Sequence, residues 1–155
     1  MGTMVSRQSP SRRILIVDDE PELVRALALR LTSAGYETLS ASDGPAAMEM
    51  ALSCQPDLVL LDIGLPLQDG YRVATMLRTE HRTAHIPIVF LTARTWDLDK
   101  AREVRPDGYV VKPYQPAELL DIVDRLTATT LESNGPGLLK SGPASGITFH
   151  LSKSA

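Results

Sequence analysis

The chain has 155 residues, of which 43% are hydrophobic, and it carries a formal net charge of -3 at pH 7. This length and apolar content predict one domain with a buried core, and the acidic balance argues against binding nucleic acid or anionic lipid through overall charge. No apolar run approaches the ~20 residues of a membrane span, the polar N-terminus has no signal-peptide core, and the single Cys54 cannot form an internal disulfide. We therefore expect a cytoplasmic protein that makes no contact with a membrane.

Five short segments are predicted to be β-strands. Four of them are apolar without alternation, which is typical of parallel strands covered on both faces: residues 14–17, 58–61, 88–91 and 109–111. The remaining segment, residues 37–41, is more mixed in character. We therefore place it at the outer edge of the sheet.

Helical periodicity fills the intervals between these strands. The first predicted helix covers residues 21–34, with a stripe of leucines, a proline in its opening turn and Gly35 at its end. The others are expected at residues 45–53, 70–80, 96–104 and 116–130. Five strands alternating with five helices predict a doubly wound α/β domain, a three-layer sandwich with a five-stranded parallel sheet between two layers of helices.

The predicted domain covers residues 13–131. Residues 1–12 are polar and are expected to be a flexible leader, and residues 132–155 are rich in Gly, Ser and Pro and are expected to be a flexible tail. Whether the chain stands alone or is cut from a longer protein is left open by the sequence.

Polar residues follow the apolar strands of the predicted sheet. Asp18 and Asp19 come after the first strand, Asp62 after the third, Thr92 after the fourth and Lys112 after the last. In open parallel sheets this carboxyl edge carries the functional groups. With strand order 2-1-3-4-5, the first and third strands are neighbours, so the three aspartates are expected to share one pocket.

Three carboxylates in one pocket oppose each other's ionisation. A divalent cation would resolve the conflict, and so few protein oxygens suit Mg²⁺ better than Ca²⁺. The alternative for Asp18 and Asp19 is a solvated acidic loop or a helix cap, because short acidic pairs recur by chance. That alternative loses weight once Asp62, Thr92 and Lys112 are considered together with them.

A carboxylate at this position could act as a nucleophile toward phosphorus. Such a transfer depends mostly on positioning and on neutralising the phosphoryl oxygens. Lys112 could supply the positive charge and Thr92 a hydroxyl donor. Taken singly, Thr92 is more often a helix cap and Lys112 more often a surface lysine, so the hypothesis depends on their joint placement.

Several motifs occur in an order that resembles the receiver domains of two-component response regulators. They are ILIVDDEP at residues 14–21, PDLVLLDIGLP at 56–66, DG at 69–70, LTA at 91–93 and VKP at 111–113. The resemblance covers about residues 12–130. It implies a flavodoxin-like receiver fold and a signalling phosphoacceptor that catalyses only its own phosphorylation and dephosphorylation, with no cofactor other than Mg²⁺.

The resemblance also implies a role for each site residue. Asp62 would be the phosphorylation site, Thr92 and Lys112 would contact the phosphoryl group, and Tyr109 would be the switch aromatic. The metal ligands would be Asp18, Asp19, Asp62 and the backbone carbonyl of Gly64. The implied partners are a histidine kinase or histidine phosphotransfer protein, a downstream effector protein and a second copy in a homodimer, without direct binding of nucleic acid.

Some features depart from the pattern or fall outside the site. The interval between Thr92 and Lys112 is shorter than is usual in the family, and Arg105-Pro106 replaces a common Gly-Ala pair. The fourth helix is therefore expected to be short or distorted. Asp57 begins the strand that ends at Asp62, and is expected to be structural. No function is assigned to the histidines, His81, His85 and His150.

Three other functions compete with the phosphoacceptor hypothesis. A phosphohydrolase with an aspartate nucleophile would need a substrate pocket or a cap domain, and the known families favour an Asp-x-Asp motif after the first strand. A scaffold that binds partners without phosphorylation would not need the acidic, Thr and Lys set. A nucleotide-binding module would need a Gly-rich phosphate loop after the first strand, and the sequence has none there.

Overall fold

The computed structural model describes residues 11–65, 70–93 and 98–132. Its five strands form one parallel sheet in the order β2-β1-β3-β4-β5, which confirms the predicted fold class and strand order. The strands are β1 (Arg13–Val17), β2 (Glu37–Ala41), β3 (Leu58–Asp62), β4 (Ile88–Thr92) and β5 (Gly108–Val111). The more polar β2 lies at one edge of the sheet, as its mixed composition predicts.

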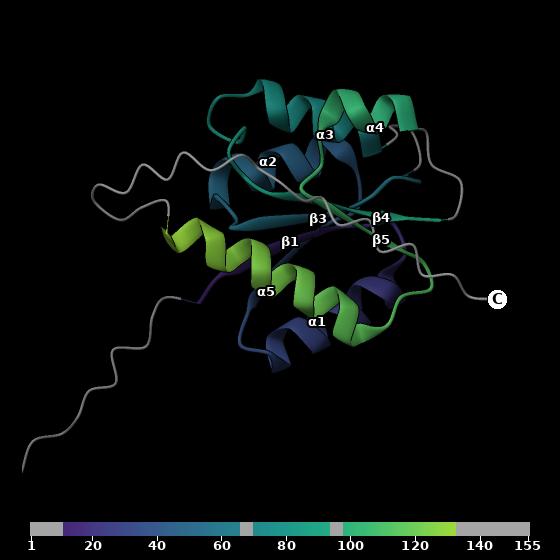
Figure 1. Cartoon of the computed structure of the whole chain (residues 1–155), viewed down its shortest axis with the longest axis vertical. Coiled ribbons are helices and arrows are strands. Elements are labelled where there is room, and N and C mark those ends of the chain that lie inside the picture. Colours follow the sequence, from purple (N-terminus) through teal and green to yellow (C-terminus); the bar gives the residue numbers. More distant parts are fainter. Residues whose placement is uncertain (1–10, 66–69, 94–97, 133–155) are drawn as a thin grey trace, which may run out of the picture.

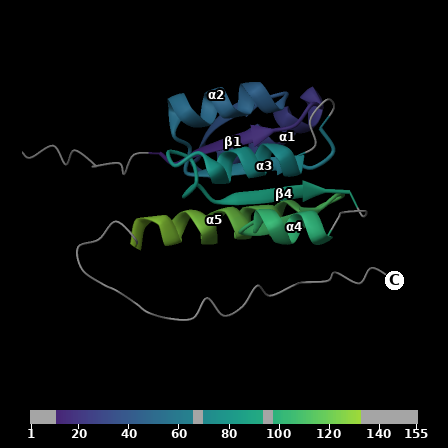
Figure 2. The ribbon, with the colours of Figure 1, turned by 90° about the horizontal axis from the view of Figure 1, so that it is seen from above.

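Five helices cover the two faces of this sheet. They are α1 (Pro21–Ser33), α2 (Gly44–Cys54), α3 (Gly70–Thr79), α4 (Leu98–Val104) and α5 (Pro116–Glu132). Figures 1 and 2 show α2, α3 and α4 on one face and α1 with α5 on the other. Among the described residues, none of the helices has the length and apolar character that crossing a bilayer would require.

The core has two halves because successive side chains of a strand point to opposite faces. Leu15 and Val17 of β1 pack with α2, α3 and α4, whereas Ile14 and Ile16 pack with α1 and α5. The central strands β3 and β4 are buried along their whole length. Burial on both faces explains why the sequences of these strands are continuous apolar runs without alternation.

The predicted element bounds differ from the structure at a few positions. Asp62 and Thr92 are the last residues of their strands instead of following them. Helix α5 ends at Glu132, slightly beyond its predicted end, and α4 begins at Leu98. The predicted start of that helix at residue 96 lies outside the described residues. With seven residues, α4 is short, as the departure from the family pattern predicts.

Arg105 ends α4 in a left-handed conformation, with φ of 53°. An L-residue with a side chain is strained in this region and glycine is not. Arg105→Gly is therefore expected to raise the free energy of unfolding by up to about 1 kcal/mol, measured by urea denaturation. The matched control is Arg102→Gly inside α4, which should lower it by about 1 kcal/mol. Equal losses in both variants would contradict the assigned strain.

Candidate functional site

Three carboxylates meet at the carboxyl edge of the sheet. Val17 of β1 pairs with Leu61 of β3, so the next residue on each strand, Asp18 and Asp62, lies at the same edge. Ligand oxygens of Asp18, Asp19 and Asp62 lie within 4.8 Å of one another. Asp18 and Asp62 are buried, and Asp19 is exposed. The parallel register thus produces the acidic pocket that the strand order predicts.

Lys112 brings a positive charge to this pocket. Its Nζ lies 3.1 Å from Oδ2 of Asp18 and 3.4 Å from Oδ2 of Asp62. The backbone N–H of Lys112 donates to the carbonyl of Thr92 at 2.7 Å, which fixes the end of β5 beside the end of β4. The ammonium therefore bridges two carboxylates that are far apart in the sequence.

Backbone N–H groups orient the two buried carboxylates. Oδ1 of Asp18 accepts from the N–H of Glu20 at 3.0 Å, and Oδ1 of Asp62 accepts from the N–H of Gly64 at 2.9 Å. Each aspartate therefore has one oxygen held by the loop that follows it and the other directed to Lys112. Such hydrogen bonds favour the charged form and restrict its rotamers.

Gly70 brings the start of α3 close to Asp62. A Cβ at Gly70 would lie 2.4 Å from the carbonyl oxygen of Asp62 and 2.6 Å from Cα of Ile63. The Gly70 N–H donates to the carbonyl of Ile63 at 2.9 Å. The close approach of two backbones is the physical reason for a glycine at position 70. Pro66 and Asp69, which belong to the motifs on either side of this loop, lie outside the described residues.

The charges in the pocket perturb each other. Burial raises the pKa of Asp62 above its ordinary value, and the Asp18 charge adds to the rise. The hydrogen bond from the Gly64 N–H and the Lys112 charge lower this pKa, but by less than burial raises it. Burial disfavours the charged form of Lys112 as well, yet the carboxylates of Asp62 and Asp18 raise its pKa overall. In the absence of a metal ion the pocket therefore holds more negative charge than one ammonium can compensate.

Tyr114 is a neighbour of the site that the sequence interpretation missed. Burial raises its pKa to about 12, with the Asp18 charge adding to the rise. The ring packs with the core half formed by α1 and α5. An aromatic residue shortly after the VKP motif was the only available signal, and its spacing alone does not show that the phenol lies near an aspartate.

Thr92 and Tyr109, the predicted switch residues, lie on the neighbouring strands β4 and β5. Thr92 is buried at the end of β4, and its hydroxyl donates to the carbonyl of Ala93 at 2.5 Å. Tyr109 on β5 is half-buried and packs against the core half formed by α2, α3 and α4. In this structure the Thr92 hydroxyl is thus directed to its own loop, and it would have to rotate to reach a group on Asp62.

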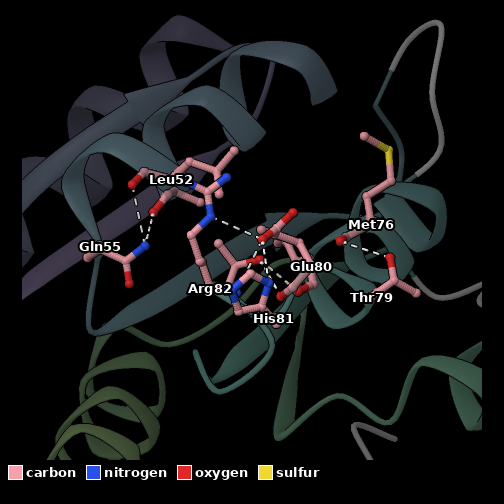
Figure 3. A network of polar contacts seen from close by, with 10 residues as sticks. Leu52, Gln55, Met76, Thr79, Glu80, His81 and Arg82 are labelled. Atoms are coloured by element: carbon pink, nitrogen blue, oxygen red, sulfur yellow. Dashed lines mark hydrogen bonds and ion pairs between the residues drawn. The ribbon is translucent and has the colours of Figure 1, made fainter.

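The residues assigned no chemistry lie away from the pocket. Asp57 accepts a hydrogen bond from the backbone N–H of Arg13 at 2.8 Å, which is a structural role at the other end of the strands. Figure 3 shows the turn after α3, where the carboxylate of Glu80 contacts His81 at 3.3 Å and Arg82 at 3.1 Å. His85 is exposed. His150 lies outside the described residues.

The raised pKa of Asp62 predicts a pH-dependent effect of Asp62→Asn on stability. The native state binds this proton more tightly than the unfolded chain does, so ionised Asp62 lowers stability at neutral pH. The cost disappears as the pH falls through the raised pKa. Without Mg²⁺, Asp62→Asn is expected to raise the free energy of unfolding on the order of 1 kcal/mol near neutral pH and progressively less in acid.

Urea denaturation of both proteins across this pH range measures the difference. The control is the same comparison with saturating Mg²⁺, which should remove or reverse the gain because a bound cation stabilises the native wild type. A gain that is the same at every pH would contradict the assignment of the cost to ionised Asp62.

Comparisons with known proteins agree with this geometry. The sequence model of the family described as response regulator receiver domain matches residues 14–124. The DNA-binding dual master transcriptional regulator RpaA of Synechocystis is 39% identical over 120 residues, covering 76% of this chain and 50% of RpaA. The phosphate regulon transcriptional regulatory protein PhoB of Pseudomonas aeruginosa is 41% identical over 128 residues, covering 81% of this chain and 54% of PhoB.

Solved structures show the same fold. The chemotaxis response regulator CheY4 of Vibrio cholerae superposes with a TM-score of 0.69 at 26% identity, covering 75% of this chain and 98% of CheY4. The receiver domain of the sensor histidine kinase PA1611 from Pseudomonas aeruginosa superposes with a TM-score of 0.71 at 30% identity, covering 76% of this chain and 98% of that domain. That structure has a magnesium ion coordinated in its active site cleft.

The region of similarity is the part of the chain that carries the sheet and the acidic pocket. The chain spans about half the length of the curated relatives RpaA and PhoB. The match to the family model covers well over half of the chain and includes every predicted site residue. The chain therefore belongs to the response regulator receiver domain family, the phosphoacceptor signalling domains of two-component systems.

Proposed function

We propose that Asp62 is the phosphoacceptor of this receiver domain. The observation that carries the proposal is the position of its carboxylate, beside Asp18 and Asp19 and 3.4 Å from the Lys112 ammonium, at the carboxyl edge of β3. Asp18 has partners of the same kind, but its side chain is 0% exposed, whereas that of Asp62 is 10% exposed. Asp62 is central among the strands and is the carboxylate best placed to receive a group from outside.

The acidic pocket fits Mg²⁺. The ligands would be the carboxylates of Asp18, Asp19 and Asp62 and the backbone carbonyl of Gly64, all of them hard oxygen donors of the kind that Mg²⁺ prefers. Burial and the Asp18 charge both raise the pKa of Asp62, and a cation in the pocket would favour its ionised form. When bound, Mg²⁺ would neutralise the negative oxygens of a phosphoryl group.

The chain's own residues would perform the rest of the transfer. An oxygen of the ionised Asp62 forms a bond to phosphorus while the bond from phosphorus to the donor breaks, and a donor histidine takes up a proton as it leaves. Lys112 is close enough to contact the phosphoryl group on Asp62, since its Nζ already contacts that carboxylate. Thr92 would turn its hydroxyl from Ala93 to a phosphoryl oxygen.

The consequence would be a switch in the surface that partner proteins contact. Phosphorylation adds up to about two negative charges beside Thr92 and Lys112. Moving a domain from mostly inactive to mostly active needs a difference of ~5.5 kcal/mol, which a few charge-assisted hydrogen bonds can supply. The Tyr109 ring would turn inward when Thr92 moves, because the two residues lie on the neighbouring strands β4 and β5.

The partners proposed are a histidine kinase or phosphotransfer protein as donor and an effector protein as the reader of the switch. A homodimer, a cytoplasmic location and the absence of nucleic-acid binding by this chain stay predictions from the sequence and the family. So does the division into a leader of residues 1–12, a receiver domain of 13–131 and a tail of 132–155. RpaA, a DNA-binding regulator, is matched over 50% of its own length.

Intact-mass spectrometry after incubation with acetyl phosphate tests the proposal. Wild-type protein is expected to gain one phosphoryl group with Mg²⁺ and none after addition of EDTA, and the adduct should be labile to hydroxylamine. Asp62→Asn should gain none while keeping its circular dichroism spectrum. An Asp62→Asn variant that is labelled as well as the wild type would overturn the assignment. A wild type that stays unlabelled even with a kinase known to donate to receivers would favour the scaffold function.

A further inference from the structure

The guanidinium of Arg78 connects two loops at the edge of the sheet opposite Asp62. Arg78 lies in the last turn of α3. Its Nη1 donates to the carbonyls of Ala84 and Ile86 at 3.2 and 2.9 Å. Its Nη2 donates to the carbonyl of Arg105 at 3.1 Å and to Oδ2 of Asp107 at 2.7 Å. One side chain therefore joins the loop before β4 to the loop that follows α4.

Asp107 extends this contact into the sheet. Its Oδ2 accepts from the backbone N–H of Ile88 at 2.8 Å, and its own N–H donates to the Ile88 carbonyl at 2.9 Å. The Arg78 side chain is 23% exposed, so its ion pair with Asp107 is partly shielded from water. The beginnings of β4 and β5 and the end of α4 are thus held at one point.

Helix α4 buries few of its described side chains, and Nζ of Lys100 lies 5.7 Å from the centre of the Tyr71 ring of α3. It has seven residues, and Ala101 and Val104 are its buried side chains among those that the structure describes. Its other described side chains are exposed: Asp99, Lys100, Arg102 and Glu103. A helix of two turns is not stable by itself and depends on its contacts. Val104 stands directly before Arg105, so the Arg78 contact lies next to one of the two buried residues.

The two ends of α4 therefore differ. The C-terminal end is joined through Arg105 to Arg78, and the Arg105 N–H donates to the carbonyl of Ala101 at 3.0 Å. The N-terminal end, at Leu98, follows Thr92 in the chain after a short connection. The N-terminal end of α4 is therefore the end nearer to Thr92 in the sequence.

We propose that Arg78 is a positioning residue that clamps the C-terminal end of α4, so that the response to phosphorylation is confined to the N-terminal end. The clamp consists of the Arg78 guanidinium, the Arg105 carbonyl and the Asp107 carboxylate. The first part of the proposal, the anchoring of α4, is independent of phosphorylation. Its second part, the confinement, rests on the proposed phosphorylation of Asp62.

Hydrogen exchange of the full chain, followed by mass spectrometry, tests the anchoring without a phosphodonor. Arg78→Met removes the donors and keeps the aliphatic stem. It is expected to speed exchange of the amides in the last turn of α4 and at Arg105 by about tenfold or more, with β1 and β3 unchanged. The matched control is Arg82→Met, which removes an arginine that contacts Glu80 in the adjoining turn and should leave α4 unchanged.

An Arg78→Met variant with wild-type exchange in α4 would overturn the clamp, and so would an equal acceleration in α4, β1 and β3. If that variant does not fold, Asp107→Asn takes its place, because it weakens the ion pair and keeps the shape of the side chain. The expected result is a smaller acceleration at the same amides. No acceleration there would overturn the clamp.

The confinement is tested by repeating the exchange with acetyl phosphate and Mg²⁺. In the wild type, exchange should change in the first turn of α4 and not at Arg105, whereas in Arg78→Met the change should extend through the helix. The same extent in both proteins would overturn the confinement. If mass spectrometry shows no phosphoryl adduct, the proposed phosphorylation fails, and the experiment without donor still decides whether Arg78 anchors α4.

Discussion

Gly70→Ala is expected to lower the free energy of unfolding by about 2–3 kcal/mol and to slow labelling of Asp62. The added Cβ would lie 2.4 Å from the Asp62 carbonyl oxygen and 2.6 Å from Cα of Ile63. Both neighbours are backbone atoms, so the strain cannot be relieved by rotating a side chain. Either α3 or the end of β3 must shift, and a shift of β3 changes the position of the Asp62 carboxylate relative to Lys112.

Urea denaturation and the initial rate of labelling by acetyl phosphate measure the two effects. Gly64→Ala is the matched control for stability, because its Cβ would meet only Oδ1 of Asp62, at the ordinary contact distance of 3.5 Å. We expect that variant to lose little stability. A Gly70→Ala protein as stable as Gly64→Ala would show that the close approach at α3 is not a constraint.

Lys112→Met is expected to lower the free energy of unfolding without Mg²⁺ by about 2 kcal/mol. The substitution leaves Asp18 and Asp62 without the ammonium that contacts both of them. Because the pKa of Lys112 is raised, its stabilising charge is present throughout the neutral range and is lost only as the pH rises through that raised pKa. The loss should therefore be the same at mildly acidic and neutral pH as long as Asp62 stays ionised.

A double-mutant cycle with Asp62→Asn isolates the contact. In the Asp62→Asn background the same Lys112 substitution should cost less, because one of its two carboxylates is already neutral. Added Mg²⁺ should also restore much of the stability of Lys112→Met, since the cation takes over the compensation of charge. Equal costs of Lys112→Met in both backgrounds would show that the ion pair with Asp62 contributes nothing.

The sheet could be predicted because burial on both faces leaves a direct record in the sequence. The runs that became β1, β3 and β4 have to be apolar throughout, and the mixed composition of β2 marks an edge strand. Given the strand order 2-1-3-4-5, the meeting of Asp18 with Asp62 follows from parallel register. The acidic pocket is thus a consequence of topology.

Other features depend on rotamers and long-range contacts, which leave no periodic record. The sequence marks Thr92 and Lys112 as site residues, yet it does not show that the Thr92 hydroxyl donates to Ala93 or that one ammonium contacts two carboxylates. Arg78 looks like an ordinary surface arginine of α3. Its contacts with Arg105 and Asp107 are visible only when the two loops are placed side by side.

Locating the phosphoryl group tests the central claim most directly. After labelling with acetyl phosphate and Mg²⁺, borohydride reduction converts an aspartyl phosphate to homoserine, and peptide mass spectrometry then identifies the residue. We predict a single modified position, Asp62, in the peptide that contains β3. Homoserine at Asp18 or Asp19, with Asp62 unmodified, would contradict the assignment of Asp62 as the phosphoacceptor.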